Sequence, residues 1–338
     1  MITPADTAPH VREIRKVTPR AFAEEIAPDY RPVVMRGLCA DWPSVAAGRH
    51  SARAMADYLL RFDKDSVVKM FAGGSLIQGR FFYRPDMTGF NFQRAQILLK
   101  VMVEALLKEE EAAEPRALYA GSAPAEQSYP GWVEANRLPL FTPGATPRIW
   151  LGNASRVTAH FDVSANVAVV VAGSRRFTLF PPQQTANLYV GPLDWTIAGQ
   201  PTSMVDIEAP DLERFPRFAA ARQAMQVADL EPGDAIFIPS LWWHEVRATG
   251  RFNVLVNYWW GQQGGSPFAA LIHALETVRD LPRAEREAVR AWFDHWIFGE
   301  RPQAAADHLP PQGRSILGPA SPERTRRIRD YLLKELGR

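Results

Sequence analysis

The segment from Arg148 to Phe180 places a metal-binding pattern directly before a strand-forming run, and this combination limits what the chain can fold into. Within it, His160-Phe161-Asp162 precedes Asn166–Ala172, which is apolar after its asparagine. Residues i and i+2 of an extended strand point to the same side, so His160 and Asp162 can offer an imidazole and a carboxylate to one point. The sequence therefore predicts ligands carried on a β-strand.

Turn-forming residues follow the apolar run. Gly173-Ser174 separates it from Arg176–Phe180, a second strand-like run that Pro181-Pro182 ends. This pattern predicts a β-hairpin with a hydrophobic body and with the two polar ligands at its mouth. A His-x-Asp pair also occurs in surface strands that bind nothing, and the apolar context is what favours a site here.

A third ligand is available downstream, at His244 in the stretch GDAIFIPSLWWHEV. Two histidines and one carboxylate that leave other positions open are the arrangement of non-haem Fe(II) oxygenases. His160, Asp162 and His244 are therefore the candidate metal ligands.

Composition sets the broad class. The chain has 338 residues, of which 46% are hydrophobic and 22% charged, and its net charge is +2. This is ordinary globular composition and gives no argument for nucleic acid binding. The single cysteine, Cys39, excludes an intrachain disulfide and fits a reducing compartment. The first residues lack a signal-peptide core and no run is long enough to span a membrane, so we expect a cytoplasmic protein without membrane contact.

Local patterns predict the remaining elements. Strands are expected at 33–36, 67–71, 80–83, 117–120, 235–238 and 253–260, and helices at 19–26, 51–61 and 91–108. Residues 121–147 should be loops, with Trp132 as a buried anchor. The long connection 183–230, with a helical stretch near 217–227, could cover the mouth of the site, because loops of this length are often functional.

The C-terminal region changes character. Ser266-Pro267 combines an N-cap with proline at the first helical position, and apolar spacing then predicts three helices. We therefore divide the chain into residues 1–265, a β-rich domain with N-terminal helices, and residues 266–338, a helical region. Its apolar stripes need partners, either the β-rich body or a second copy in a homodimer.

Several motifs together resemble one family. HFD at 160–162, Asn166, AGSRRFTLFPP, GDAIFIPSLWWHEV, NVLVNYWW and the opening PVVMRGLCADWP are similar to the cupin-like branch of the JmjC-type oxygenases, in particular its asparaginyl hydroxylases. The resemblance covers roughly residues 30–260. It implies a double-stranded β-helix, or jelly roll, with Fe(II) held by His160, Asp162 and His244 and with 2-oxoglutarate as cosubstrate. Members of this branch often dimerise through helices after the barrel.

The resemblance also implies a cosubstrate site. Arg175 stands where these relatives place a lysine for the distal carboxylate, and Tyr119 matches a tyrosine that binds the same group. Asn166 and Asn257 match asparagines that line the pocket. The alternatives are a solvent-facing Arg175 and a plain core tyrosine. Trp242, Trp243, Tyr258 and Trp259 are suited to wall a dry pocket.

One departure concerns a threonine that these relatives carry three residues before the first histidine. Position 157 is valine here, and Thr158 follows it. One position along a strand reverses the face, so either the contact is lost or a local bulge restores it.

We therefore expect an Fe(II)- and 2-oxoglutarate-dependent oxygenase that hydroxylates a C–H bond of a protein side chain or a small molecule. The alternatives are a metal-binding cupin of other chemistry and a non-catalytic scaffold that acts through its C-terminal helices. The identity of the substrate is not encoded in these motifs. We expect selectivity to reside in residues 183–230 and in Phe81-Phe82-Tyr83.

Overall fold

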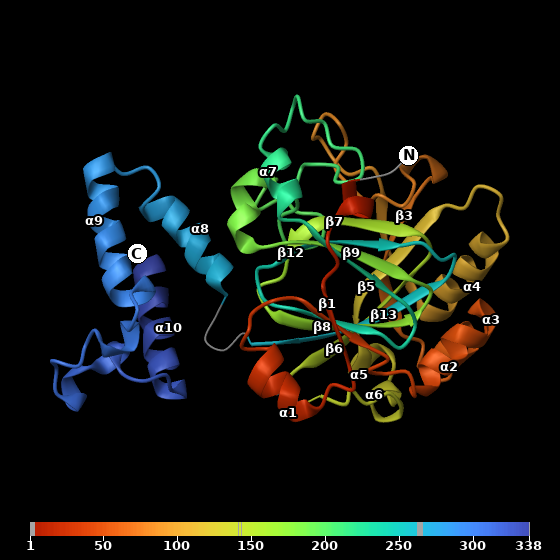
Figure 1. Cartoon of the computed structure of the whole chain (residues 1–338), viewed down its shortest axis with the longest axis horizontal. Helices are drawn as coiled ribbons and strands as arrows, with labels where there is room; N and C mark the ends of the chain where they lie inside the picture. Colours follow the sequence, from red (N-terminus) through yellow and green to blue (C-terminus); the bar gives the residue numbers. More distant parts are fainter. Residues whose placement is uncertain (1–3, 141, 143, 262–265, 338) are drawn as a thin grey trace. The chain divides into compact units, whose positions relative to one another are not determined.

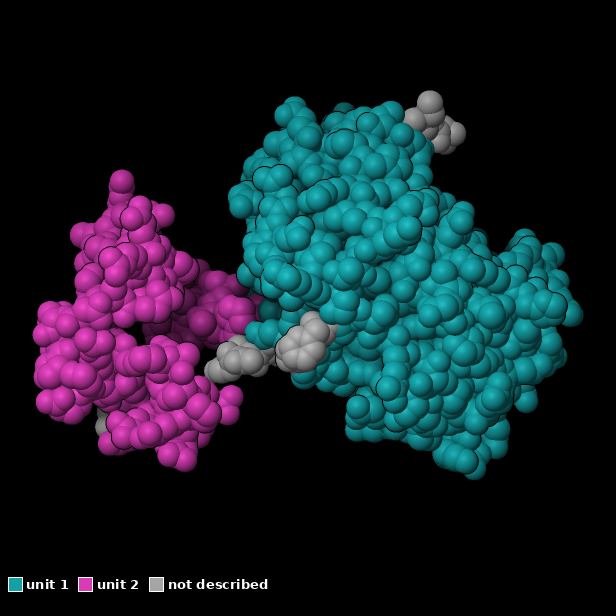
Figure 2. Space-filling model, turned by 60° about the horizontal axis from the view of Figure 1, so that its bottom comes forward, with its two compact units in different colours: residues 1–261 teal, residues 262–338 magenta. Residues whose placement is uncertain are grey.

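The computed structural model describes residues 4–140, 142, 144–261 and 266–337. The chain divides into two compact units, residues 1–261 and residues 262–338, which Figure 2 shows in different colours. The strands that the structure describes belong to the first unit, and the second is helical (Figure 1).

The first unit opens with short helices and with two strands that belong to the larger sheet. In chain order they are η1 (Pro4–Thr7), β1 (Arg12–Arg15), α1 (Pro19–Ala21), η2 (Phe22–Ile26), β2 (Val33–Arg36), α2 (Pro43–His50) and α3 (Ala52–Leu60). Ser51 caps α3 as expected, because its hydroxyl accepts a hydrogen bond from the Ala54 amide at 3.1 Å.

Two sheets form the body of this unit. Nine strands follow the order β1-β2-β11-β8-β13-β6-β5-β3-β4, and four follow the order β10-β9-β12-β7. The remaining strands are β3 (Val67–Gly73), β4 (Gln93–Leu98), β5 (Ala117–Pro124), β6 (Thr146–Gly152), β7 (Ser155–Phe161), β8 (Ala165–Ala172), β9 (Arg175–Phe180), β10 (Gln226–Leu230), β11 (Ala235–Ile238), β12 (Trp243–Ala248) and β13 (Asn253–Trp260). From β7 to β13 the chain crosses repeatedly between the sheets, as in the expected jelly roll.

The predicted hairpin around Gly173 is wrong. β8 pairs with β11 and β13 in the large sheet, whereas β9 pairs with β10 and β12 in the small one. Gly173, at φ +71°, turns the chain from one sheet to the other. The run reads as continuously apolar because β8 is buried on both faces: Val167, Val169 and Val171 face one core and Ala168 and Val170 the other.

The sequence also misplaced two elements near residue 90. The expected helix 91–108 is a strand, β4, followed by α4 (Leu99–Glu110). β4 pairs with β3 at the exposed edge of the large sheet, so tertiary pairing overrides a local pattern that suits a helix. The expected strand 80–83 is reduced to isolated bridges at Arg80 and Tyr83.

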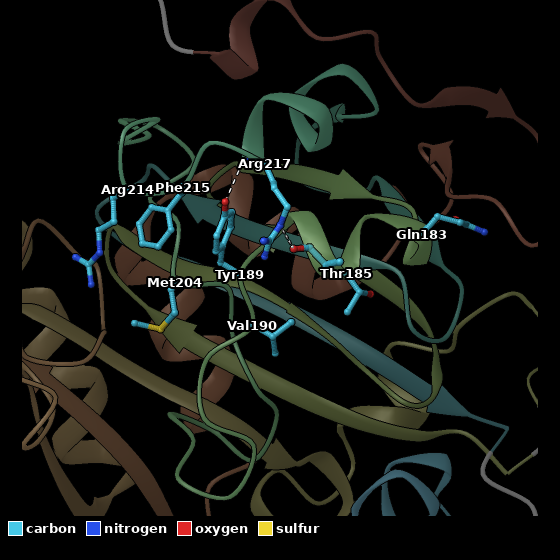
Figure 3. Close-up of a pocket in the computed structure, with 9 residues that line it drawn as sticks. Gln183, Thr185, Tyr189, Val190, Met204, Arg214, Phe215 and Arg217 are labelled. Carbon is cyan, nitrogen blue, oxygen red and sulfur yellow. Dashed lines mark hydrogen bonds between the residues drawn. The ribbon is translucent and has the colours of Figure 1, made fainter. Parts of the chain in front are cut away.

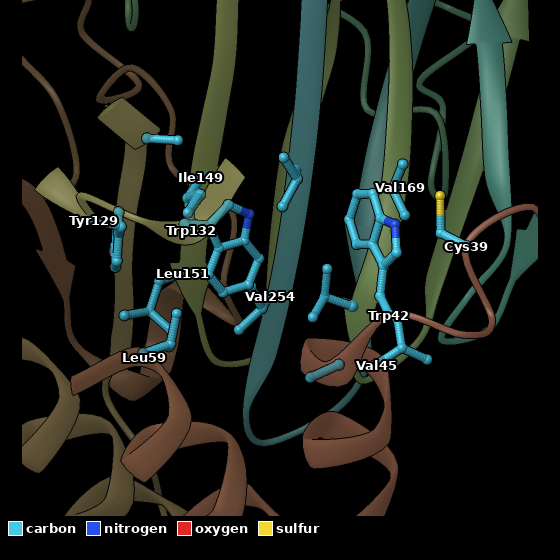
Figure 4. Close-up of a cluster of buried hydrophobic side chains, with 14 of the residues drawn as sticks. Cys39, Trp42, Val45, Leu59, Tyr129, Trp132, Ile149, Leu151, Val169 and Val254 are labelled. Atoms are coloured by element: carbon cyan, nitrogen blue, oxygen red, sulfur yellow. The ribbon is translucent and has the colours of Figure 1, made fainter. Parts of the chain in front are cut away.

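The main core lies between the large sheet and helices α2, α3 and α4. Trp132, on the short helix α6 (Trp132–Ala135) that follows α5 (Ala125–Ser128), is fully buried as predicted. Figure 4 shows Trp132 and Trp42 packed beside Leu151, Val254 and Val169 of the sheet. This packing supports the sheet from behind and leaves its other face for the space between the sheets.

The long connection after β9 contains η4 (Pro182–Asn187) and α7 (Phe218–Gln223). Isolated bridges join Thr202 to His160 and Val190 to Ser203, and the Ser203 amide donates to the Ala159 carbonyl at 2.7 Å. This connection is therefore attached directly to β7, the strand that carries the candidate ligands.

The second unit contains α8 (Pro267–Thr277), α9 (Arg283–Phe293), η5 (Asp294–Phe298) and α10 (Pro322–Leu336), with short 3-10 turns η6 (Pro302–Ala304), η7 (Pro311–Gly313) and η8 (Ser315–Leu317) between them. Among its described residues, only Ala306 is buried. Trp292, Phe298 and Leu333 are instead mostly exposed. Across both units, no helix in the described part of the chain is long and apolar enough to cross a bilayer.

Candidate metal centre

The three predicted ligands converge at one place. His160 lies near the end of β7, Asp162 follows that strand directly, and His244 lies on β12, where it pairs with His160 across the small sheet. One ligand atom from each residue lies within 4.8 Å of the others. The Nε2 atom of His244 is 3.7 Å from Oδ2 of Asp162, and the two imidazole centroids are 4.4 Å apart.

Backbone carbonyls fix the orientation of both imidazoles. The Nδ1 atom of His160 is 2.9 Å from the Thr158 carbonyl oxygen, and Nδ1 of His244 is 3.0 Å from that of Trp242. A carbonyl only accepts, so each Nδ1 carries the proton and each Nε2 offers a lone pair to a metal. Burial lowers the pKa of His244 to about 3, which keeps this imidazole neutral at physiological pH.

Asp162 supplies the carboxylate. Its Oδ1 atom accepts a hydrogen bond from Nε2 of Gln200 at 3.2 Å, while Oδ2 lies nearest His244. Burial raises the pKa of this carboxyl group. A divalent cation would offset that penalty, because it stabilises the charged form. Two imidazole nitrogens and one carboxylate oxygen suit Fe(II) with its remaining coordination positions open.

The ligands line a cavity of about 1140 Å³ between the sheets. Arg175, Tyr119, Asn166 and Asn257, the four residues predicted for the cosubstrate, all line the same cavity. The structure thus brings together the residues that the sequence proposed for the metal and for the cosubstrate.

Arg175 is the clearest sign of a missing anion. It begins β9, only 4% of it is exposed, and its Nε atom has no hydrogen-bond partner. Burial lowers its pKa to about 10, so the guanidinium still carries its charge at neutral pH. A buried cation without a partner is costly. A carboxylate bound in the cavity would satisfy it, and this fits the distal end of 2-oxoglutarate.

Tyr119 faces this charge from β5. Its ring stacks on Trp150 with centroids 5.9 Å apart, and it interacts electrostatically with Arg175. Burial raises the pKa of the phenol, so Tyr119 is a neutral hydrogen-bond donor. Arg175 is buried and not solvent-facing, whereas Tyr119 both lines the cavity and packs against the aromatic cluster that contains Phe71 and Phe81.

The two asparagines form a pair. Nδ2 of Asn257 donates to Oδ1 of Asn166 at 2.9 Å, and both side chains are buried. Oδ1 of Asn257 is buried and has no hydrogen-bond partner in the described part of the chain. Amides inside an otherwise apolar strand need such partners to be stable.

The departure at Val157 is resolved by a β-bulge. Val246 pairs with Val157 and His244 with His160, so Thr158 and Ala159 together stand opposite Glu245. Because of this extra residue, Val157 and Thr158 both line the cavity. The hydroxyl of Thr158 is buried and has no hydrogen-bond partner among the residues that the structure describes.

The predicted aromatic wall was partly wrong. Trp259 lines the cavity, but Trp242, Trp243 and Tyr258 pack into separate hydrophobic cores. Trp150 also lines the cavity, although no sequence motif indicated it. Gln200 was also missed, because only the fold of the long connection brings it to Asp162.

Neighbouring features serve other purposes. Arg176 points away from Arg175, as expected from strand alternation, and pairs with Asp229 at 2.7 Å.

A second pocket of about 690 Å³ lies along η4 and the approach to α7 (Figure 3). Its lining contains Tyr189, Phe215 and Arg217 but none of the candidate metal ligands.

A jelly roll with two histidines and a carboxylate converging in its cavity defines a cupin with a candidate metal centre. Residues 19–266 match the family of the Cupin-like domain. The tRNA wybutosine-synthesizing protein 5 of Mus musculus is 27% identical over 312 residues, covering 82% of this chain and 91% of that protein.

Shorter matches involve other proteins. Lysine-specific demethylase 8 of Xenopus tropicalis is 36% identical over 116 residues, 34% of this chain and 25% of that protein. HSPB1-associated protein 1 of Bos taurus is 34% identical over 118 residues, 34% of this chain and 24% of that protein. The chain belongs to the cupin-like domain family and is a cupin of the JmjC type.

Proposed function

We propose that this protein is an Fe(II)- and 2-oxoglutarate-dependent oxygenase that hydroxylates a C–H bond of a protein side chain or a small molecule. The observation that carries this proposal is the coexistence, in one cavity, of the His160, Asp162 and His244 cluster with the buried and unpaired cation of Arg175. A metal site alone fits many cupins. The added anion site selects an acidic cosubstrate.

Each residue has a defined task under this proposal. His160, Asp162 and His244 hold Fe(II), and Arg175 with the Tyr119 hydroxyl binds the distal carboxylate of 2-oxoglutarate. Fe(II) with 2-oxoglutarate and O₂ supplies the oxidising chemistry, in which the cosubstrate is oxidatively decarboxylated as the C–H bond is hydroxylated. The Thr158 hydroxyl and the free oxygen of Asn257 orient bound groups.

The cavity also needs protection from water. Residues 195–202 of the long connection contribute Ile197, Gly199 and Gln200 to its lining, and Gln200 contacts a metal ligand. The phenol of Tyr83 donates to the Trp195 carbonyl at 2.8 Å, which holds this segment in place. Trp150 and Trp259 supply apolar walls, which suit a site that contains a reactive oxidant.

The names of the relatives point to different substrates. One is named for wybutosine synthesis in tRNA and another for lysine demethylation. We therefore propose only the hydroxylation of a C–H bond and infer no substrate from the names of the relatives.

We also propose that the protein works in the cytoplasm as a homodimer. Cys39, its single cysteine, is fully buried, and burial raises the pKa of its thiol, as suits a structural residue in a reducing compartment. The exposed apolar side chains of the second unit support association of two copies.

Anaerobic titration of the purified apoprotein with Fe(II) and then 2-oxoglutarate tests the oxygenase proposal. A weak visible charge-transfer band should appear only with both, and His160→Ala should remove it while far-UV circular dichroism stays unchanged. Metal binding without the band would instead indicate a cupin of other chemistry. Binding of neither would leave a scaffold that acts through its C-terminal helices.

A further inference from the structure

The cavity carries positive charge that the proposed cofactors do not use. Among the described residues that line it, Asp162 is the only carboxylate, whereas four are cations: Lys69, Arg94, Arg148 and Arg175. Fe(II), Asp162, a doubly charged 2-oxoglutarate and Arg175 would neutralise one another. The other three cations would remain without a counter-charge.

Arg94 has a structural task. Its Nη2 atom donates to the Ile197 carbonyl at 2.6 Å, and its guanidinium lies 4.6 Å from the centroid of Phe90. These contacts hold the segment that covers the cavity. Arg94 is not neutralised either, but it holds the segment that covers the cavity, so Lys69 and Arg148 are the cations that remain for a ligand.

Arg148 is fixed without being neutralised. Nη1 donates to the carbonyl and the hydroxyl of Ser122 at 3.0 and 3.2 Å, and the guanidinium lies 5.7 Å from the ring of Trp259. Neither Arg148 nor Lys69 forms an ion pair with any residue that the structure describes. Both charges are thus available to a ligand.

Strand geometry places Lys69 and Arg148 on the same face of the large sheet. Lys69 lies two residues before Phe71 on β3, and Arg148 two residues before Trp150 on β6, so each shares a face with a cavity-lining aromatic residue. β3 and β6 run in the same direction, because each is antiparallel to β5 between them. Phe71 is level with Tyr119 and, through it, with Gly152, so Lys69 is level with Trp150 and Arg148 lies about 7 Å further along β6.

The strand between them brings the Trp150 ring onto the cavity wall near both cations. β5 bulges at Gly121 and Ser122 opposite Trp150, and Ser122 has a positive φ of 58°. A Cβ atom on Gly121 would come within 2.8 Å of the Trp150 ring. Because Gly121 has no side chain, the Trp150 ring lies against β5, and an anionic group bound by both Lys69 and Arg148 would lie beside this ring.

We propose that Lys69 and Arg148 bind a carboxylate or phosphate of the substrate, so that the preferred substrate is an anion. This inference rests on the proposed function, because it assigns the remaining charge of the cavity to the molecule that is hydroxylated. It names two specificity-determining residues outside the metal and cosubstrate sites.

Calorimetry on the full chain with Mn(II) and saturating 2-oxoglutarate tests the inference with matched probes. Adenosine 5′-monophosphate against adenosine reports a phosphate, and N-acetylglutamate amide against N-acetylglutamine amide reports a carboxylate. We expect at least one anion to bind about tenfold more tightly than its neutral counterpart, and this preference to weaken with salt. The probe that binds distinguishes the two sources of charge.

Variants locate the preference. Lys69→Gln and Arg148→Gln should each remove most of it, Arg148→Lys should keep part of it, and Lys108→Gln, an exposed change on α4, should leave it intact. Equal binding or no binding of anions and neutral probes would overturn the inference, as would a preference that survives the double variant. Binding of 2-oxoglutarate is measured first and separately, so loss of the cosubstrate site would count against the proposed function alone.

Discussion

Arg175 shows how a single residue can oppose stability while serving binding. The fold buries its guanidinium and leaves Nε without a partner, although the charged form persists. Such a residue is stabilised only when an anion arrives. The buried charge of Arg175 therefore destabilises the apoprotein, and binding of an anion would remove this penalty.

Replacing Arg175 with Met should separate the two effects. We expect the apoprotein to gain about 1–3 kcal/mol in free energy of unfolding, because a buried unpaired charge is removed. The dissociation constant for 2-oxoglutarate should rise by at least about 100-fold, since a buried charge pair contributes several kcal/mol. Chemical denaturation and calorimetry measure these quantities, and unchanged Fe(II) affinity serves as the control. A variant that is less stable and binds 2-oxoglutarate normally would contradict the assignment.

Thr158→Val tests the bulge of β7 at the level of one hydroxyl group. Because the hydroxyl is buried without a partner, its removal should leave the stability unchanged or slightly higher. Loss of one hydrogen bond to the cosubstrate should weaken 2-oxoglutarate binding about five- to tenfold. Thermal denaturation and calorimetry would show both, and equal affinity in the two proteins would remove Thr158 from the site.

At this scale the sequence predicted the residues whose chemistry is unusual for their place. A histidine and an aspartate two apart, and asparagines inside apolar strands, stand out against their neighbours. Lys69, Arg148 and Trp150 do not, because charged and aromatic residues are common in exposed or half-buried strands. Only the arrangement of β3, β5 and β6 gives them a shared surface.

Among the elements, β1 adds an ion pair to its backbone pairing with β2. Arg36 of β2 bonds the carboxylate of Glu13 on β1, with Nε 3.0 Å from Oε2, and Arg36 also pairs with Asp234 at 2.6 Å. The hydrogen bond from Arg36 lowers the pKa of Glu13 below its ordinary value of 4.5. A lowered pKa means that this contact stabilises the fold above pH 4.5 and is lost as pH falls through the lowered value.

Hydrogen exchange of the β1 amides should show this dependence. At pH 7 we expect stronger protection in the wild-type protein than in Glu13→Gln, and the difference should shrink as the pH falls through the lowered pKa of Glu13, because the carboxylate becomes protonated. Amides of β8, which is buried on both faces, are the internal control. A difference between the two proteins that stays constant with pH would refute the role of this ion pair.

Elements defined by local pattern were predicted well, and those defined by distant partners were not. β13 begins and ends where its aromatic and branched residues do, and Ser266 and Ser321 cap α8 and α10 as their sequences suggest. The Gly173 turn looked like a hairpin because a local pattern does not specify which sheet receives the next strand. β4 looked helical for a related reason. Its local pattern suits a helix, and its partner strand β3 lies outside that local window of sequence.

At the scale of the whole molecule, the second unit leaves large apolar side chains exposed. Trp292 is 66% exposed, Phe298 72% and Leu333 71%, and large apolar surfaces of this kind mark interfaces. We expect light scattering to give the mass of a dimer and Trp292→Glu to shift it towards the monomer. Glu287→Ala, an exposed change on the same helix, should not. A monomer at all concentrations of the wild-type protein would refute dimerisation.

The register of the large sheet has a consequence for the life of the newly made chain. β2 lies near the start of the sequence, yet Val34 pairs with Ile236 of β11. His160 likewise pairs with His244, which lies far along the chain. Partners so distant slow folding, and they cannot meet until synthesis has passed them. The candidate metal centre is thus completed only after β12 has been made, and a ribosome-bound chain that ends before His244 has only two of the three candidate ligands to offer.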